Sequence, residues 1–341
     1  MGLTNLVRLA LVITFIVIML GAYTRLADAG LGCPDWPGCY GHFTVPNEHH
    51  EIALANALYP ELTIEANKAW LEMIHRYFAG SLGLLVLVIV IKALRHDAVP
   101  NRLPIALSVV VVFQALLGMW TVTMKLMPIV VMGHLLGGFT LFCLLALIHW
   151  QLSAKVELFS EARGIKWLAS AALCLVVIQI ALGGWTSSNY AALMCTDLPI
   201  CDGNWRTHLD FEGAFTLIQP EQPSYEYGTL DYGARMTIHV THRLGAVLLT
   251  LVSVCLITSL LLTKMASLKR SALRVSILLA LQIGLGVTNV VFGLPLFVAV
   301  AHNLVAALLL ISILYVNYQL WQKDVTDDLK VPNLLGKESE S

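Results

Sequence analysis

Four histidines inside apolar stretches have the spacing of two related pairs. His75 and His134 are 59 residues apart, and His242 and His302 are 60 apart. The first members of the pairs are separated by 167 residues and the second members by 168, which indicates an internal duplication of the 341-residue chain. An ionisable side chain inside a membrane marks a functional site by default. Two imidazoles at one depth can clamp a metal, and a haem is the commonest such ligand in a helical membrane bundle.

An arginine follows the first histidine of each pair. The segment EMIHR at 72–76 returns as HVTHR at 239–243, and both copies continue into an apolar stretch that contains glycine. Arg76 and Arg243 suit the propionates of a haem, because a guanidinium binds carboxylates through charge-assisted hydrogen bonds. The pattern therefore predicts at least one haem site.

The two copies differ three residues before that histidine, where Glu72 stands opposite His239. Residues three apart share a helix face, so we expect Glu72 beside a haem held by His75. A carboxylate in this place can transfer protons. It can alternatively pair with Arg76, four residues further along the helix. The asymmetry predicts that one half holds a cofactor and the other carries an acid–base group beside its haem.

The composition is that of a multispan membrane protein. Apolar residues make up 57% of the chain and charged residues 13%, and we expect no nucleic-acid partner. Eight stretches reach the roughly 20 residues that cross a bilayer. The spans of this all-α integral membrane protein are expected at about 6–24, 69–92, 103–123, 129–150, 165–186, 234–262, 271–292 and 296–319.

The distribution of charge predicts the orientation. Lysine and arginine gather at the N-terminus and in the loops after the second, fourth and sixth spans, whereas the long loops at 25–68 and 187–233 are acidic. The positive-inside rule then places both termini in the cytoplasm and both long loops outside. No cleavable signal or transit segment is evident, so we expect a bacterial inner membrane with the loops in the periplasm.

Each half contains four spans, which return the chain to the side on which it started. We therefore expect two tandem, pseudo-symmetric four-helix bundles, at 1–155 and 156–322, related by an axis along the membrane normal. The remaining residues, 323–341, are expected to form a polar cytoplasmic tail.

Each long loop carries a pair of cysteines at the same spacing. Cys33 and Cys39, and then Cys195 and Cys201, are C-x5-C pairs offset by 162 residues. An oxidising exterior favours one disulfide in each loop. The density of Gly, Pro and Trp around the first pair predicts an ordered loop at the interface. Such a loop can cap the helix ends, cover a ligand as a lid, or do both.

Three spans share the pattern Gln-x-x-x-Gly. The pairs are Gln114 with Gly118, Gln179 with Gly183, and Gln282 with Gly286. Small residues at such positions let helices approach closely, so we favour packing as their role. An intramembrane glutamine can alternatively donate a hydrogen bond to a polar ligand.

Three features together resemble the haem A synthase family, over about residues 5–320. They are the loop CPDWPGC at 33–39, the run NKAWLEMIHR at 67–76 and the duplicated four-histidine plan. One departure is the segment LADA at 26–29, where relatives tend to carry Thr and Ser. Cysteines that match the second pair occur in only part of that family.

The resemblance implies an oxidoreductase that acts on a methyl group. The C8 methyl of haem O becomes a formyl group through successive hydroxylations, and the product, haem A, serves terminal oxidases. On this pattern His75 and His134 flank the substrate haem O, and Glu72 is essential beside them. His242 and His302 ligate a resident haem b that relays electrons.

The resemblance also implies partners. They are a haem O synthase, cytochrome oxidase or its assembly factors, an unidentified electron donor and the lipid bilayer, and a homo-oligomer is compatible with the sequence. The Cys33–Cys39 pair would cap the substrate half.

Three alternatives use the same residues. A di-haem b-type cytochrome would use the four histidines for electron transfer alone and would not need Glu72. A transporter built from repeats would more usually show broken helices and polar residues at the bilayer midplane. An outer metal site would be built from Cys33, Cys39, His42, His49 and His50.

Overall fold

Eight long helices build the fold. The computed structural model describes residues 2–153, 163–198, 201 and 205–321, and in this part of the chain eight helices are long and apolar enough to span a membrane. They are α1 Leu3–Leu26, α3 Ala66–Ala93, α4 Arg102–Thr123, α5 Pro128–Ser153, α6 Arg163–Ser188, α8 Tyr232–Leu262, α9 Ala266–Val291 and α10 Leu296–Trp321. Each overlaps one predicted span, so the predicted all-α membrane class is confirmed.

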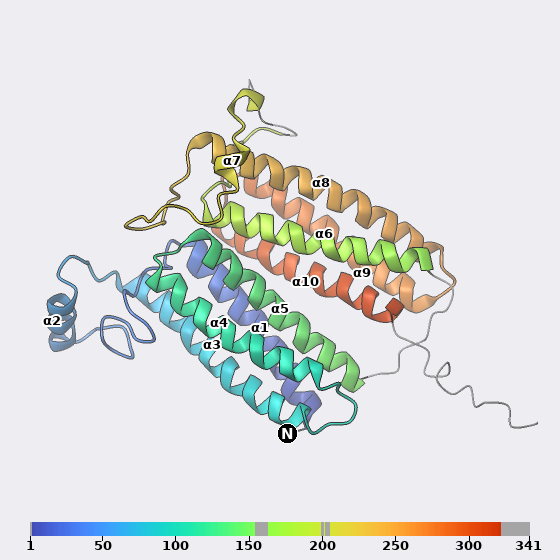
Figure 1. The fold of residues 1–341 in the computed structure, drawn as a ribbon, viewed down its shortest axis with the longest axis horizontal. Coiled ribbons are helices and arrows are strands. Elements are labelled where there is room, and N and C mark those ends of the chain that lie inside the picture. The colour runs from blue at the N-terminus through green and yellow to red at the C-terminus, as the bar shows by residue number, and fades with distance from the viewer. Residues whose placement is uncertain (1, 154–162, 199–200, 202–204, 322–341) are drawn as a thin grey trace, which may run out of the picture.

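The helices lie in two groups side by side. Figure 1 shows α1, α3, α4 and α5 in one group, called here the first group, and α6, α8, α9 and α10 in the other, the second group. A buried cluster joins them, because Ile18 of α1 and Phe142 of α5 pack with residues of the second group such as Val176 and Ile313. The predicted boundary at 155/156 and the tail at 323–341 lie outside the described residues. The duplication and the orientation of the termini remain predictions.

The outward faces of the helices are apolar. Leu84, Val109 and Leu262, for example, are 70%, 63% and 81% exposed. Within a bilayer, lipid chains cover such side chains, and the helices satisfy their own backbone hydrogen bonds. The chain is therefore a multi-pass membrane protein.

Both long loops lie at one end of the helices, opposite the N-terminus (Figure 1). The first contains the short helix α2 His49–Leu58, and the second contains the 3-10 turn η1 Trp205–His208 and the short helix α7 Phe211–Ala214. These short elements were not predicted. The end of the molecule that carries both loops is called the loop end below.

Candidate functional site

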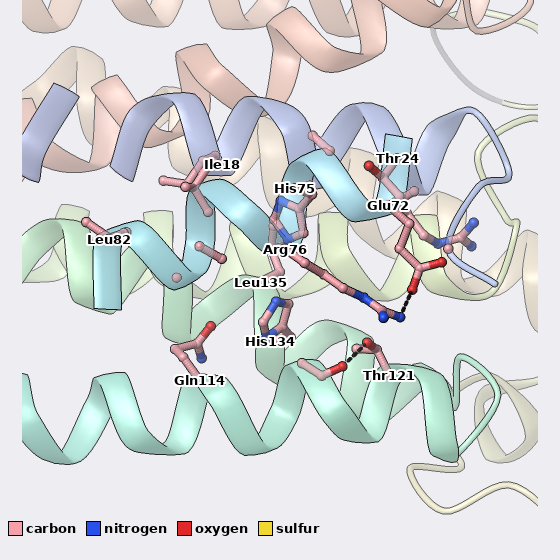
Figure 2. Close-up of a pocket in the computed structure, with 18 of the residues that line it drawn as sticks. Ile18, Thr24, Glu72, His75, Arg76, Leu82, Gln114, Thr121, His134 and Leu135 are labelled. Carbon is pink, nitrogen blue, oxygen red and sulfur yellow. Dashed lines mark hydrogen bonds and ion pairs between the residues drawn. The ribbon is translucent and has the colours of Figure 1, made fainter. Parts of the chain in front are cut away.

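Two of the predicted histidines face each other across a cavity in the first group. His75 of α3 and His134 of α5 have ring centroids 6.4 Å apart and planes at 84°. Both line a cavity of about 760 Å³ that lies mainly between α1, α3, α4 and α5 and is also lined by residues of α6 and α10 (Figure 2). This volume lies within the roughly 300–1,000 Å³ typical of sites for small molecules and cofactors.

Each of the four histidines packs its ring against a glycine of a neighbouring helix. A Cβ atom at these glycines would lie 2.9–3.5 Å from the Cε1 atom of the histidine. The contacts pair Gly21 with His75, Gly118 with His134, Gly183 with His242, and Gly286 with His302. The last three glycines end the Gln-x-x-x-Gly patterns. They have the packing role expected of them, and what they pack against is the imidazole.

The separation of His75 and His134 fits a metal between them. A histidine nitrogen coordinates a metal at about 2 Å, so two rings on opposite sides of one metal have centroids about 6 Å apart. The observed 6.4 Å agrees with this value. Within the described part of the chain, the buried Nδ1 atoms of both rings have no hydrogen-bond partner. Neither ring is therefore committed to another side chain.

Glu72 lies beside this pair, towards the loop end of the cavity (Figure 2). The residue is 5% exposed. Arg76 Nη2 donates to its Oε1 at 2.5 Å, and the backbone N–H of Cys33 donates to its Oε2 at 2.9 Å. Glu72 thus forms the ion pair with Arg76 that was one interpretation of the sequence. It also lines the cavity, as a place beside a haem would require. The two interpretations are compatible.

Arg76 fastens the first loop over the cavity. Its Nη1 donates to backbone oxygens of that loop, among them the oxygen of Asp35 at 2.9 Å. Cys33 and Cys39 form the predicted disulfide in the same loop, and Trp36 lines the cavity. The loop is therefore a cap over the helix ends and a lid over the cavity at once.

In the second group, the histidines have glutamine partners. Gln179 Nε2 lies 3.0 Å from His242 Nδ1 and donates to the backbone oxygen of the same histidine at 2.9 Å. Gln282 Nε2 lies 3.2 Å from His302 Nε2. Packing was the favoured role of these glutamines. The structure adds a direct contact with the predicted ligands, which links residues on different helices.

Arg243 holds the second loop as Arg76 holds the first. Its Nη2 donates to the backbone oxygen of Cys195 at 2.5 Å, and its Nε donates to His239 Nε2 at 3.1 Å. The predicted disulfide between Cys195 and Cys201 is present. Both arginines, which the sequence pattern assigned to propionates, thus also use N–H groups to order their loops.

The alternative of an outer metal site finds no support. The disulfide occupies the sulfur atoms of Cys33 and Cys39. Among the residues that the structure describes, no group of three or more His, Cys, Asp or Glu side chains could hold a metal ion.

Sequence analysis missed Arg25, which lines the cavity at the end of α1 and reaches the second group. It donates to the Tyr190 hydroxyl and to the backbone oxygen of Ser187, both at 2.7 Å. The Tyr190 hydroxyl donates to Asp28 Oδ1 at 2.8 Å. Burial raises the pKa of the Tyr190 phenol, which keeps it a donor. A charged residue at the end of an apolar span was the available signal.

Comparison with known proteins gives one consistent result. The family described as cytochrome oxidase assembly protein matches residues 4–314. A haem A synthase of Shewanella oneidensis is 53% identical over 325 residues, which cover 95% of this chain and 98% of that protein. A haem A synthase of Caulobacter vibrioides is 28% identical over 324 residues, which cover 87% and 89%. One of Nitrosospira multiformis is 26% identical over 340 residues, which cover 90% of each.

Proposed function

Because this chain belongs to the haem A synthase family of cytochrome oxidase assembly proteins, we propose that it is itself a haem A synthase. Its reaction oxidises the C8 methyl of haem O to a formyl group. The net change replaces two hydrogens of the methyl by one oxygen, in two successive two-electron oxidations. The product, haem A, serves terminal oxidases.

His75 and His134 would hold the substrate haem O from its two faces. Their rings have the separation required for one metal, and the cavity between them is lined at its loop end by Arg25 and Arg76. Guanidinium groups at that end suit the two propionates of the substrate, which would share them with the carboxylates of Asp28 and Glu72. The apolar remainder of the macrocycle would then lie between the helices.

Glu72 would accept protons released as the methyl is oxidised. A carboxylate that acts as a base must be held at the right place, and Glu72 is held by Arg76 and by the N–H of Cys33. The lid over the cavity limits the access of water, which strengthens electrostatic interactions at the site. Arg76 and the first disulfide therefore position the base as well as the loop.

His242 and His302 would ligate a resident haem b, with Arg243 near its propionates. Such a group supplies one-electron redox chemistry, and the protein sets its orientation. Gln179 and Gln282 contact these two rings. These contacts are made by the amide nitrogens, whereas an iron-bound imidazole donates its remaining N–H, so each amide would turn its oxygen to the ring once haem is bound.

The eight apolar spans and the basic short loops support a place in a bacterial inner membrane, with both disulfide loops in the periplasm. The donor of haem O and the acceptor of haem A would then meet the protein in the bilayer. We expect a haem O synthase on one side of the reaction and an oxidase or its assembly factors on the other.

The observation that carries the proposal is the buried Glu72 at a cavity lined by two histidines that have no side-chain hydrogen-bond partner in the described part of the chain. A cytochrome that only transfers electrons needs neither a carboxylate there nor space for exchange of the ligand. In the second group, His239 stands at the position that corresponds to Glu72 by the 167-residue spacing.

Extraction of pigments from the purified protein tests the proposal. Wild type and Glu72→Ala are made in a host whose membranes supply haem O, and the haems are separated by chromatography. Haem A or its hydroxymethyl precursor is expected from wild type, and only haem b and haem O from the variant. Two equivalents of haem b in both proteins, without a modified haem, would establish the electron carrier instead.

A further inference from the structure

Gln114 of α4 carries a donor atom that the described part of the protein leaves without a partner. It lines the cavity on the other side of the histidine pair from Glu72 (Figure 2). Its Nε2 atom is buried, and no hydrogen-bond acceptor for it exists among the described residues. A buried donor without a partner is costly, so this amide calls for an acceptor that comes from outside the protein.

The corresponding amide of the second group has a different environment. Gln282, which follows Gln114 by the 168-residue spacing, has its Nε2 3.2 Å from His302. The third glutamine of the pattern, Gln179, contacts His242. Of the three, Gln114 is the one that lines the cavity and has its Nε2 unpaired within the described ranges.

Gly137 of α5 makes room for the amide of Gln114. A Cβ atom there would collide with that amide, so the side chain lies against α5 only because residue 137 lacks one. Gly245 in the second group receives the amide of Gln179 in the same way, and that amide contacts a histidine. The glycine therefore provides the space for the amide but does not decide its partner.

The cavity is polarised along the helices. Arg25, Glu72 and Arg76 line it towards the loop end, whereas the far side is lined mainly by apolar residues such as Ile18 and Leu82. Gln114 lies on that far side, one helical turn from Gly118 and hence about 6 Å beyond the level of the His134 ring along α4. An amphipathic macrocycle would place its carboxylates at the loop end and its apolar edge beside Gln114.

Haem O has an acceptor in the right place for this orientation. It differs from haem B in one substituent, on the edge opposite the propionates, where an isoprenoid chain with a hydroxyl on its first carbon replaces a vinyl group. With the propionates at Arg25 and Arg76, that hydroxyl lies on the side of Gln114. Haem B has no polar group there.

We propose that Gln114 forms a hydrogen bond with the side-chain hydroxyl of haem O and so selects haem O over haem B at this site. Gly137 is a positioning residue, because it makes room for the amide. The inference rests on the proposed function and adds to it the group that distinguishes the substrate from its precursor. A hydroxyl can accept from Nε2 and donate to Oε1, so one amide can satisfy it twice.

Binding titrations test this without turnover. Haem O or haem B is added to the purified full chain carrying its resident haem, under anaerobic conditions, and absorption difference spectra give the two Kd values. A His75→Ala protein serves as the control for haem that binds outside this cavity. In Gln114→Leu, haem O should bind about fivefold more weakly while haem B is unaffected, as expected for loss of one hydrogen bond. Gly137→Val, which displaces the amide, should lower the same preference.

The inference would be overturned if the ratio of the two Kd values in Gln114→Leu equalled that of wild type. Unchanged Kd values would then mean that the amide has no role in binding, and an equal weakening of both would indicate a packing role. The proposed function fails separately, if wild type neither binds nor oxidises haem O. A wild type that oxidises haem O beside a Gln114→Leu variant with unchanged preference would remove the role of Gln114 alone.

Discussion

The two helix groups seat their histidines alike but surround them differently. In both groups a glycine receives each ring, and an arginine after the first histidine donates to backbone oxygens of a disulfide loop. In the first group the rings border a cavity beside Glu72. In the second, glutamines contact both rings, and His239 takes the place of Glu72.

The difference shows how a common arrangement can support two roles. Glutamine side chains within reach of both imidazoles can orient them for a cofactor that stays, with the amide oxygen accepting from the ring N–H. Uncommitted imidazoles, a cavity and a buried carboxylate suit a ligand that arrives, reacts and leaves. In terms of the proposed function, the second group is the cofactor holder and the first is the reaction site.

The largest effect should come from removing one histidine, first from one pair and then from the other. His75→Ala should abolish haem A formation and leave one haem b per chain, because the resident haem depends on the other pair. His242→Ala should remove that haem b. Haem content per chain, measured by chromatography on protein normalised for amount, checks both. Loss of the same haem in both variants would contradict the assignment of roles.

The next effect should separate Glu72 from its counterpart. Glu72→Gln keeps the size of the side chain and an acceptor for the Cys33 N–H but removes the base, so haem O oxidation should slow by about 10²–10⁴-fold. His239→Gln should slow it by less than about tenfold, since no proton transfer is assigned to it. Single-turnover rates on bound haem O provide the comparison. Equal losses would mean that Glu72 has no special chemical role.

A smaller effect should distinguish the two disulfides. Cys33→Ser with Cys39→Ser loosens the loop whose backbone N–H holds Glu72, so the oxidation rate should fall roughly tenfold, in line with a lost hydrogen bond to a charged group. Cys195→Ser with Cys201→Ser should affect the rate less. The measurement is the same turnover assay on oxidised protein, with haem content as the control. A stronger effect from the second pair would argue against positioning by the first loop.

The smallest effect should come from the glycines beneath the rings. Gly21→Ala places a Cβ 2.9 Å from His75 Cε1, and Gly183→Ala places one 3.2 Å from His242 Cε1. Overpacking of this kind costs at least about 1 kcal/mol, so haem O should bind about fivefold more weakly in the first variant. The second should weaken haem b retention less. Spectral titration checks the first, and haem loss on dilution checks the second. Unchanged binding in both variants would show that the rings do not depend on these contacts.

Much of the architecture could be predicted from local sequence. The eight spans follow from hydrophobic length, and each overlaps an observed helix. His75 and His134 could be paired from spacing alone, and both disulfides from two matching cysteine pairs in acidic loops. These features are repeated, local or both, so a single sequence contains them.

The contacts of individual side chains were harder to predict. The link from Arg25 to Tyr190 joins residues 165 positions apart, and the contact of Gln179 with His242 joins two helices. The sequence allowed two interpretations of Glu72, an ion pair with Arg76 and a place at the ligand site. One carboxylate can form the ion pair and also line the cavity. The packing of the helices decides which partner a side chain reaches.

The sequence by itself determined the membrane class, the number of spans and the four histidines, because burial in lipid requires long apolar stretches in which a charge or an imidazole stands out. Only the tertiary structure decided that the first pair borders a cavity whereas the second contacts glutamines. That outcome depends on the volume left between helices, where a missing Cβ atom, as at Gly137 and Gly245, makes room for an amide against the neighbouring helix.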